Sequence, residues 1–266
     1  MLDKRVKGCL LVIGNEVLEG RTQDTHTKWF ADQLSEQGIW LDEVRIIPDD
    51  KDRIAAAVRE CKEKFSHVFT TGGLGPTVDD ITTESVAAAF DPPLVLIKDA
   101  ATDAKLIAYY AKTHREYNAD RKKMALVPEG AVVIPNIEGV APGFALNNVY
   151  VFPGIPKETK AMFDSIKGKL VGGPKPVSKS IFVIAAEGDI NTGLRAVKKA
   201  CPDVIIGSYP NNNPATGRMI TEIKFRHTDA ALVEAAHTEM MKFITENGLK
   251  LTEKPPVEEL QQVRGI

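Results

Sequence analysis

A glycine-rich turn between a strand and a helix constrains this chain more than any other feature of its sequence. The segment from Gly72 to Glu84 reads GGLGPTVDDITTE, and it follows the apolar run 67–71, which has strand character. Residues 80–90 then have the alanine and valine spacing of a helix. Glycines at such a junction admit positive φ and let a ligand approach the backbone, and the free N–H groups of a helix start favour an anion. The turn therefore predicts a phosphate site.

Acids and hydroxyls follow these glycines within one helical turn. Carboxylates repel phosphate unless a cation intervenes, and oxygen ligands suit a hard divalent cation. The pattern thus predicts a metal beside the phosphate. The alternative is an ordinary tight turn with an aspartate N-cap and a first-turn glutamate, which needs no ligand. The acids are Asp79, Asp80 and Glu84, and the hydroxyls belong to Thr77, Thr82 and Thr83.

Strands and helices alternate through the first half of the chain. Apolar runs predict strands over 8–14, 39–47 and 67–71, and helix-spaced apolar residues predict helices over 25–37 and 52–65. This order favours an α/β fold with a mostly parallel sheet covered on both faces, where ligands bind beyond the carboxyl ends of the strands. Loops from three strand ends should then converge on one crevice. Those loops carry Gly14, Asn15 and Glu16; Asp49 and Asp50; and Gly72, Gly73, Leu74 and Gly75.

Each loop residue also has a simpler explanation when it is taken alone. Asp49 and Asp50 fit a helix N-cap followed by a first-turn acid, and Glu16 fits a solvated loop acid. The turn Pro153-Gly154 follows a strand over 149–152 and could merely redirect the chain. Only the joint placement of these loops favours a ligand site.

Composition narrows the possible partners. The chain has 266 residues, 43% of them hydrophobic, which is enough for one large and one small domain. Its formal net charge of -2 gives no general reason to bind nucleic acid or an anionic membrane, and no apolar run is long enough to span one. The three cysteines lack disulfide or zinc spacing, and the five histidines form no ligand pattern. We therefore expect a cytoplasmic protein with neither nucleic acid nor membrane as partner.

The second half of the chain predicts a linker and a smaller domain. Residues 101–123 resemble one long polar helix that ends in a basic run, and repeated Pro and Gly predict non-helical loops over 124–131 and 139–145. The segment 172–176 reads GGPKP and is the clearest linker. We expect domains over 1–172 and 177–250, with a tail over 251–266. The second domain should be a small α+β unit with the order strand-helix-strand-strand-helix over 179–185, 189–200, 204–209, 219–226 and 229–247, and with a polar hairpin loop over 209–214.

Several of these segments, taken together, resemble the CinA-like proteins (competence/damage-inducible protein A). Their first domain has the three-layer, molybdopterin-binding fold of MoaB/Mog type. The resemblance covers about residues 7–163, and the second domain looks like the small domain that follows in CinA-like chains. The run 20–25 also resembles the molybdopterin-binding-like domain of eukaryotic FAD synthases. The segments that carry the resemblance are 13–16 with Gly20, 22–25, 72–84, 128–131, 141–144 and 153–158.

The resemblance implies two functional classes that share a pyrophosphate ligand and a divalent metal. The closer branch implies metal-dependent hydrolysis of an ADP-ribose-like or FAD-like dinucleotide. The other branch implies molybdopterin binding or adenylylation, and a third possibility is a nucleotide-binding module without turnover. Magnesium, manganese or cobalt is the expected cofactor, molybdopterin is a candidate ligand, and a homodimer is the expected assembly.

Site residues follow from the resemblance position by position. The catalytic acids fall on Asp80, Asp49 and Glu84, with Asp80 and Asp49 as metal ligands. The remaining ligand-binding positions are Gly14, Asn15, Glu16, Gly72, Gly73, Leu74, Gly75, Thr77, Thr82, Pro153 and Gly154.

This chain departs from the pattern at three positions. Many relatives have Asp, Asn and Ser where it has Asn15, His26 and Lys157, which leaves the substrate less certain than the fold. The nicotinamide-nucleotide amidohydrolase domain of full-length CinA proteins is not expected in this chain.

Overall fold

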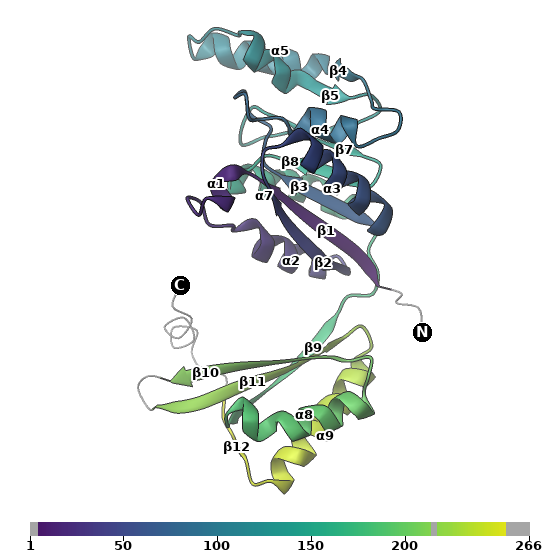
Figure 1. Ribbon diagram of the computed structural model, residues 1–266, viewed down its shortest axis with the longest axis vertical. Helices are drawn as coiled ribbons and strands as arrows, with labels where there is room; N and C mark the ends of the chain where they lie inside the picture. Colours follow the sequence, from purple (N-terminus) through teal and green to yellow (C-terminus); the bar gives the residue numbers. More distant parts are fainter. Residues whose placement is uncertain (1–4, 214–216, 254–266) are drawn as a thin grey trace. The chain divides into compact units, whose positions relative to one another are not determined.

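The chain folds into two compact units. The computed structural model describes residues 5–213 and 217–253 (Figure 1). Unit 1 comprises Met1–Gly173 and unit 2 comprises Pro174–Ile266, so the division falls inside the GGPKP segment. No helix in the described residues is long and apolar enough to cross a membrane.

Unit 1 is built on a six-stranded sheet in which parallel pairing predominates. The pairs β2/β1, β1/β3 and β3/β8 are parallel, and the pairs β8/β7 and β7/β6 are antiparallel. The carboxyl ends of β1, β2, β3 and β8 therefore lie at one edge. In spatial order the strands are β2 (Ile39–Ile47), β1 (Val6–Ile13), β3 (His67–Thr71), β8 (Val149–Phe152), β7 (Gly143–Leu146) and β6 (Val132–Ile134).

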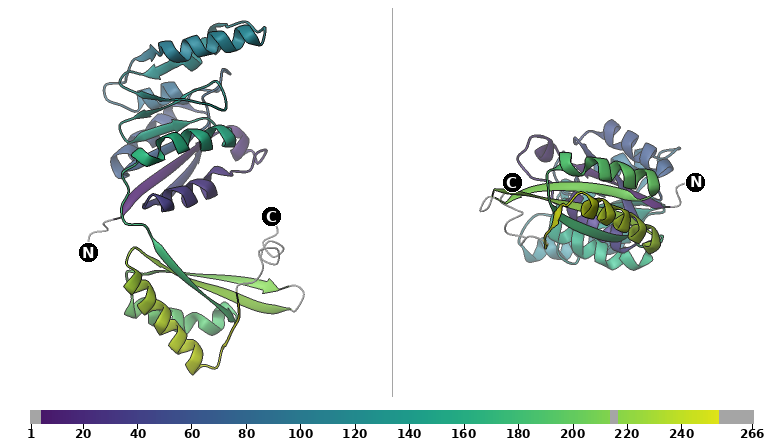
Figure 2. Two further views of the ribbon diagram at one scale, coloured as in Figure 1. Left: turned by 180° about the vertical axis from the view of Figure 1, so that it is seen from behind. Right: turned by 90° about the horizontal axis from the view of Figure 1, so that it is seen from below.

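Helices cover both faces of this sheet because its central strand is apolar on both sides (Figures 1 and 2). In β1, Cys9 and Leu11 pack in one core with residues of α3 and α4, whereas Leu10 and Val12 pack in another with residues of α2 and α7. Residues buried on alternate sides are expected for a parallel strand between two helical layers. The covering helices are α3 (Lys51–Lys64), α4 (Thr82–Ala88), α2 (His26–Glu36) and α7 (Pro156–Ile166).

Phe163 of α7 lies at the centre of an aromatic cluster in the second core. Its ring centroid is 5.2 Å from that of Trp29, 5.6 Å from Phe30, 6.2 Å from Phe69 and 6.5 Å from Phe152. These partners come from α2, β3 and β8, so one side chain ties two helices to two strands. Aromatic pairs at such distances add to the stabilisation by burial.

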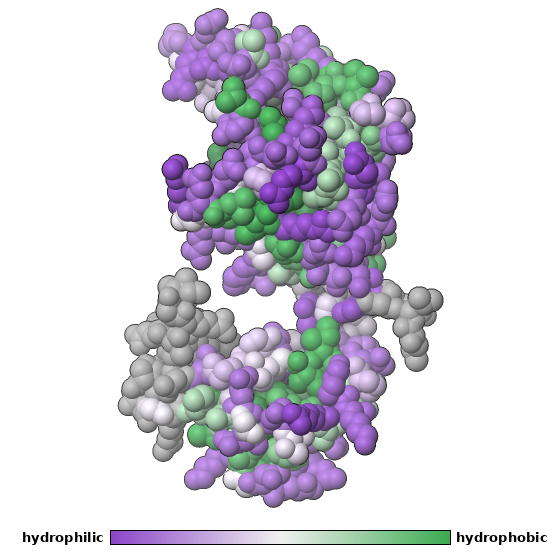
Figure 3. All heavy atoms as spheres, viewed as in Figure 1, coloured by the Kyte–Doolittle hydropathy of each residue, from purple (hydrophilic) through white to green (hydrophobic). Residues whose placement is uncertain are grey.

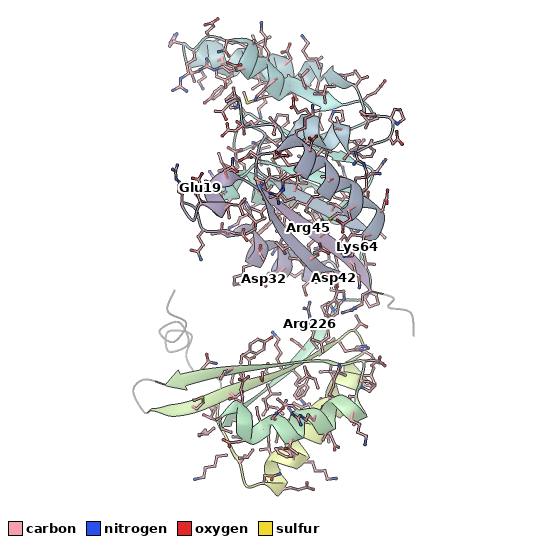
Figure 4. The ribbon with its side chains drawn as sticks, viewed as in Figure 1. Glu19, Asp32, Asp42, Arg45, Lys64 and Arg226 are labelled. Carbon is pink, nitrogen blue, oxygen red and sulfur yellow. The ribbon has the colours of Figure 1, made fainter. Side chains whose placement is uncertain are left out.

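Charged side chains link α3 to the edge strand β2. Arg45 pairs with Glu43 at 2.5 Å and with Glu60 at 2.6 Å, and Lys64 pairs with Glu43 at 2.6 Å. The labelled Arg45 and Lys64 side chains can be followed in Figure 4. Because such pairs lie near water, the two cores contribute far more to stability than they do.

An additional layer of unit 1, called the α5 layer below, lies beyond the sheet and the two helical layers that cover it. It has its own apolar cluster of Leu106, Tyr110, Met124 and Ala125, separate from the two main cores. Figure 1 shows it at the top of unit 1. It comprises α5 (Ala100–Lys112), α6 (Ala119–Lys122), the 3₁₀ helix η1 (Lys123–Ala125) and the antiparallel strands β4 (Leu96–Lys98) and β5 (Leu126–Pro128).

Several local predictions for unit 1 are wrong. The long helix over 101–123 is broken after Lys112, where His114 has a φ of 53°. The break lets Tyr117 return and stack on Tyr110, a contact that periodicity does not reveal. The loop over 14–20 contains a short helix α1 (Asn15–Leu18), and the segments expected as Pro/Gly loops contain β5 and β7.

Unit 2 is a four-stranded antiparallel sheet with two helices. Its core joins Val183, Ile223 and Phe225 of the sheet to Ile190 and Met240 of the helices. The predicted loop over 209–214 is wrong up to residue 213, because β10 continues that far in register with β11. The elements are β9 (Val177–Ile184), α8 (Glu187–Ala200), β10 (Ile205–Asn213), β11 (Arg218–His227), α9 (Ala230–Glu246) and β12 (Lys250–Leu251), in the sheet order β10-β11-β9-β12.

The expected tail over 251–266 lies mostly outside the described residues. Within them, Leu251 belongs to β12, and the N–H of Thr252 donates to the carbonyl of Phe182 at 3.0 Å.

We predict that Phe163→Ala destabilises unit 1 by about 3–5 kcal/mol, because truncation of a fully buried phenylalanine removes apolar burial and leaves a cavity. Urea unfolding followed by circular dichroism measures the change. Val132→Ala, at a side chain that is 67% exposed, should change the free energy of unfolding by less than about 0.5 kcal/mol. Equal losses for the two variants would contradict the central position of Phe163.

Candidate functional site

A cavity of about 480 Å³ opens beyond the carboxyl ends of the parallel strands. Most of the predicted site residues line it, and they come from the loops after β1, β2, β3 and β8. Asn15, Thr77, Thr82 and Glu84 are the predicted residues that do not line it. Those that do are Gly14, Glu16, Asp49, Gly72, Gly73, Leu74, Gly75, Asp80, Pro153 and Gly154.

The glycine turn packs so closely on its neighbours that side chains would not fit. Gly72 has a φ of +103°, and a Cβ atom there would lie 2.0 Å from the carbonyl oxygen of Ile13. Gly73 has a φ of +67°, and its Cβ would lie 2.1 Å from Oγ1 of Thr82. Both the left-handed backbone and the close contacts therefore require glycine.

Backbone donors of this turn remain available to a ligand. The N–H of Gly72 donates to the carbonyl of Phe152 at 3.1 Å. Within the described part of the chain, the N–H groups of Gly73, Leu74 and Gly75 have no protein acceptor. Successive free N–H groups in a turn are a common anion-binding arrangement.

Thr82 and Thr77 hold the turn instead of lining the cavity. Oγ1 of buried Thr82 donates to the carbonyl of Gly72 at 2.9 Å, and its N–H donates to the carbonyl of Gly73 at 3.1 Å. The N–H and the hydroxyl of Thr77 donate to the Asp80 carboxylate at 2.8 and 2.6 Å. The structure therefore gives both threonines positions that shape the turn.

Glu84 lies apart from the other predicted acids. It lines a smaller neighbouring cavity, and its carboxylate is 3.8 Å from Nζ of Lys51. Because Glu84 is in the first turn of α4, it matches the first-turn glutamate of the capping alternative, whereas the predicted aspartate N-cap is wrong, since the N-cap is Ile81.

The loops after β1 and β2 are joined by hydrogen bonds. The N–H of Asn15 donates to Oδ2 of Asp49 at 2.8 Å. A Cβ atom on Gly14 would lie 2.5 Å from the Glu16 carboxylate, so this acid folds over the glycine at the end of β1. Asn15 thus positions Asp49 without lining the cavity itself.

Five carboxylates line the same cavity, those of Glu16, Asp49, Asp79, Asp80 and Glu158, and the first four come from the loops after β1, β2 and β3. Burial raises the pKa of Asp49, and repulsion from the other three of these loop acids raises this pKa further, against the opposing hydrogen bond from Asn15. Hydrogen bonds from Thr77 and from its own backbone, with nearby Lys123, lower the pKa of Asp79. The cavity therefore concentrates negative charge.

This donor set fits a divalent cation that is shared with a ligand. No group of three acidic, histidine or cysteine side chains in the described residues is close enough to hold a metal unaided. Magnesium is commonly bound by one or two carboxylates together with substrate phosphates and water. Asp49 and Asp80 could supply the carboxylates, and the neighbouring glycine turn could hold the phosphate.

Two lysines of the α5 layer donate hydrogen bonds to the backbone of loops beside the cavity. Nζ of Lys123 donates to the carbonyl of Thr77 and, at 3.1 Å, to that of Asp80. Nζ of Lys105 donates to the carbonyl of Asn136 and, at 3.1 Å, to that of Gly139. The basic run 121–123 thus contributes Lys123 to the architecture of the site through backbone carbonyls.

The loop after β8 is fixed from two sides. Nε2 of His26 lies 2.9 Å from the carbonyl oxygen of Gly154, and Oγ1 of Thr159 donates to the carbonyl of Pro153 at 2.6 Å. His26 thus connects α2 to the site.

Sequence reasoning missed part of the lining. Tyr110, Met124, Val140, Ala141, Ile155 and Glu158 also line the cavity. Glu158 accepts a hydrogen bond from Nδ2 of buried Asn136 at 2.7 Å. For Glu158, its place in the resembling segment 153–158 was the available signal.

Comparisons with known proteins support the fold and the family. Residues 9–171 match a family model described as a probable molybdopterin binding domain, and residues 175–253 match one described as the FAD synthase middle domain. The crystal structure of the protein CinA, with unknown function, from Thermoplasma acidophilum superposes with a TM-score of 0.57 at 30% identity, covering 63% of this chain and 99% of that one. The predicted fold class is confirmed.

Two relatives illustrate the range of similar chains. A protein of Archaeoglobus fulgidus is 35% identical over 201 residues, which are 76% of this chain and 84% of that protein. A CinA-like protein of Synechococcus is 32% identical over 231 residues, which are 85% of this chain and 53% of that protein. The match thus spans about half the length of this CinA-like relative.

We predict that Gly72→Ala costs several kcal/mol of stability, because it adds a backbone clash to the cost of positive φ. Gly130→Ala is the matched control, since Gly130 has a φ of +83° but an open space around its Cβ. Its cost should be about 1–2 kcal/mol. Thermal and urea unfolding measure both, and equal costs would mean that the Ile13 contact is unimportant.

We predict that Asp49→Asn stabilises the metal-free protein at pH 7. A carboxyl whose pKa is raised by folding binds its proton more tightly in the folded state, so stability falls as pH rises from the unfolded pKa through the folded pKa. The gain from Asp49→Asn should therefore vanish below about pH 3, where both states are protonated. Urea unfolding at several pH values tests this, and a gain that persists at low pH would contradict the electrostatic cause.

Proposed function

This chain belongs to the family of probable molybdopterin binding domains, and we propose that it is a divalent-metal-dependent hydrolase that cleaves the pyrophosphate of an ADP-ribose-like or FAD-like dinucleotide. The CinA-like relatives and the match of residues 175–253 to the FAD synthase middle domain support a nucleotide-related role. The single observation that carries the proposal is the meeting of an anion-binding turn and five carboxylates in one cavity.

These two features are compatible only if a cation accompanies the ligand. The unpaired N–H groups of Gly73, Leu74 and Gly75 suit phosphate oxygens. Asp49 and Asp80 would repel the same oxygens across a cavity of this size. Asp49 and Asp80 would hold a divalent cation, which would neutralise phosphate charge and lower the pKa of a bound water.

The residues of the chain would orient the phosphate and the carboxylates that bind the cation. The turn fixes one phosphate group through its backbone, and Lys123 and Thr77 keep the Asp79-Asp80 segment in place. Burial and its acidic neighbours raise the pKa of Asp49 in the empty cavity, and a divalent cation bound to this carboxylate would offset that rise by stabilising its charged form.

A second candidate is molybdopterin binding or adenylylation, which the description of the matching family favours. A third is nucleotide binding without turnover, which the lack of a preformed three-ligand metal cluster in the described residues favours. The cation would be magnesium, manganese or cobalt. The free cysteines among the described residues suit the reducing cytoplasm, and a homodimer is the proposed assembly.

We predict that the purified protein releases AMP from ADP-ribose or FAD in the presence of magnesium, manganese or cobalt. Asp80→Asn should lower this rate at least about a hundredfold, because loss of a metal ligand removes several kcal/mol of charge stabilisation. The amide oxygen can still accept a hydrogen bond from Thr77, so the turn should persist. Mass spectrometry of the products measures the reaction.

Asp52→Asn is the control, because Asp52 is an exposed acid of α3 outside the cavity. It should retain the wild-type rate. Full metal-dependent turnover by Asp80→Asn would remove Asp80 from the mechanism. Intact dinucleotides with transfer of AMP from ATP to molybdopterin would favour the second candidate, and calorimetric binding of ADP-ribose without products would favour the third.

A further inference from the structure

The cavity has an apolar wall in addition to its acidic, glycine-rich end. We propose that the wall formed by Tyr110, Met124, Val140 and Ala141 is a subsite for the planar heteroaromatic ring of the ligand. The inference rests on the proposed function, because it assigns the ring end of a phosphorylated ligand whose phosphate end lies at Gly72–Gly75.

This wall is the edge of a separate apolar cluster. Tyr110, Met124 and Leu106 belong to the core of the α5 layer. Val140 and Ala141 pack against this core from the loop between β6 and β7. Neither main core of unit 1 includes these side chains. Yet four of the residues reach the same cavity as the acids. In Figure 3, apolar atoms appear within the mostly hydrophilic surface of unit 1 below the α5 layer.

The wall is held rigidly before any ligand binds. Tyr110 stacks on Tyr117 with ring centroids 5.8 Å apart and an interplanar angle of 21°, and the Arg121 guanidinium lies 4.5 Å from the Tyr110 ring centroid. Tyr110 is therefore a fixed boundary of the subsite, and it is only 6% exposed. An aromatic side chain fixed in this way offers contact area at little entropic cost.

Hydrogen bonds fix the opposite part of the wall. Nδ2 of Asn136 donates to the carbonyl of Ala141 at 2.8 Å, and Oδ1 of the same residue accepts from the N–H of Gly139 at 2.8 Å. Lys105 of α5 donates to the carbonyl of Gly139 at 3.1 Å. The loop that carries Val140 is thus tied directly to the helix that carries Tyr110.

A phosphate gains nothing from such a wall, and a sugar gains less than a flat ring because it has less apolar surface to bury. Apolar surface favours a flat ring, because the ring is removed from water while its polar edge can still meet water or protein groups. Purine, pterin and flavin rings share this chemistry. A cavity of about 480 Å³ is of the size that commonly takes a ligand with both a phosphate and a ring.

The test compares equilibrium dissociation constants in magnesium for AMP, FMN and ribose 5-phosphate, measured by calorimetry, so it does not depend on turnover. The wild-type protein should bind AMP or FMN at least about tenfold more tightly than ribose 5-phosphate, the size expected when part of one ring is buried against apolar side chains. A preference for AMP identifies a purine and a preference for FMN a flavin, and either supports the subsite. Equal affinities for all three, or no measurable binding of any, would overturn it.

Val140→Asn should reduce this ring preference at least about threefold and leave the affinity for ribose 5-phosphate unchanged. Ile137→Asn is the matched control, because Ile137 is on the same loop, is 78% exposed and does not line the cavity. It should keep the wild-type preference, and equal melting temperatures would exclude misfolding of either variant. A Val140→Asn protein with the full ring preference would overturn the assignment.

The two proposals fail in different ways. If the protein prefers AMP or FMN but cleaves no dinucleotide, the ring subsite is supported and the hydrolase proposal is contradicted. If it cleaves ADP-ribose but binds AMP, FMN and ribose 5-phosphate equally, the hydrolase proposal is supported and the ring subsite is contradicted.

Discussion

The contact between Gly72 and the carbonyl oxygen of Ile13 is the constraint on which the rest of the site depends. A Cβ atom at Gly72 would lie 2.0 Å from that oxygen, so the chain can leave β3 beside the end of β1 only if this residue is glycine. The positive φ of Gly72 and Gly73 turns the backbone toward α4, where Thr82 bonds to both carbonyls. The N–H groups of the next residues consequently remain without protein partners and line the cavity.

The carboxylates around this turn repel one another, which lowers the stability of the protein when no ligand is bound. Glu16, Asp49 and Asp80 arrive from different strand ends, and burial together with repulsion from the neighbouring acids raises the pKa of Asp49. Lys123 lowers the pKa of nearby Asp79, but it donates its hydrogen bonds to backbone carbonyls, and Lys51 lies beside Glu84. Uncompensated charge of this kind is typical of functional sites, where a ligand or cation supplies the missing partner. The same layer that places Lys123 also forms the apolar wall, so one part of the fold connects the positions proposed for the phosphate, the metal and the ring.

Much of the fold, and the acidic end of the site, followed from local sequence. Strand-helix alternation and the glycine turn predict a parallel sheet whose strand ends converge, because both depend on periodicity and backbone freedom that adjacent residues determine. The wall did not follow, since Tyr110 and Val140 meet only after the helix over 101–123 breaks and folds back. Thr82 was expected at the ligand, but its hydroxyl is buried under the turn, which is a tertiary contact that spacing does not reveal.

Dependence of ligand affinity on a divalent cation is the measurement that decides whether the acids and the glycine turn act together. Calorimetric titration of the full chain with ADP, in magnesium and then in excess chelator, compares the two conditions on one protein. If the cation bridges the Asp49 and Asp80 carboxylates and the phosphates, affinity should fall at least about tenfold without it, because the acids then repel the ligand. Equal affinity in chelator would show that the turn binds phosphate alone and that the carboxylates do not hold a cation for this ligand.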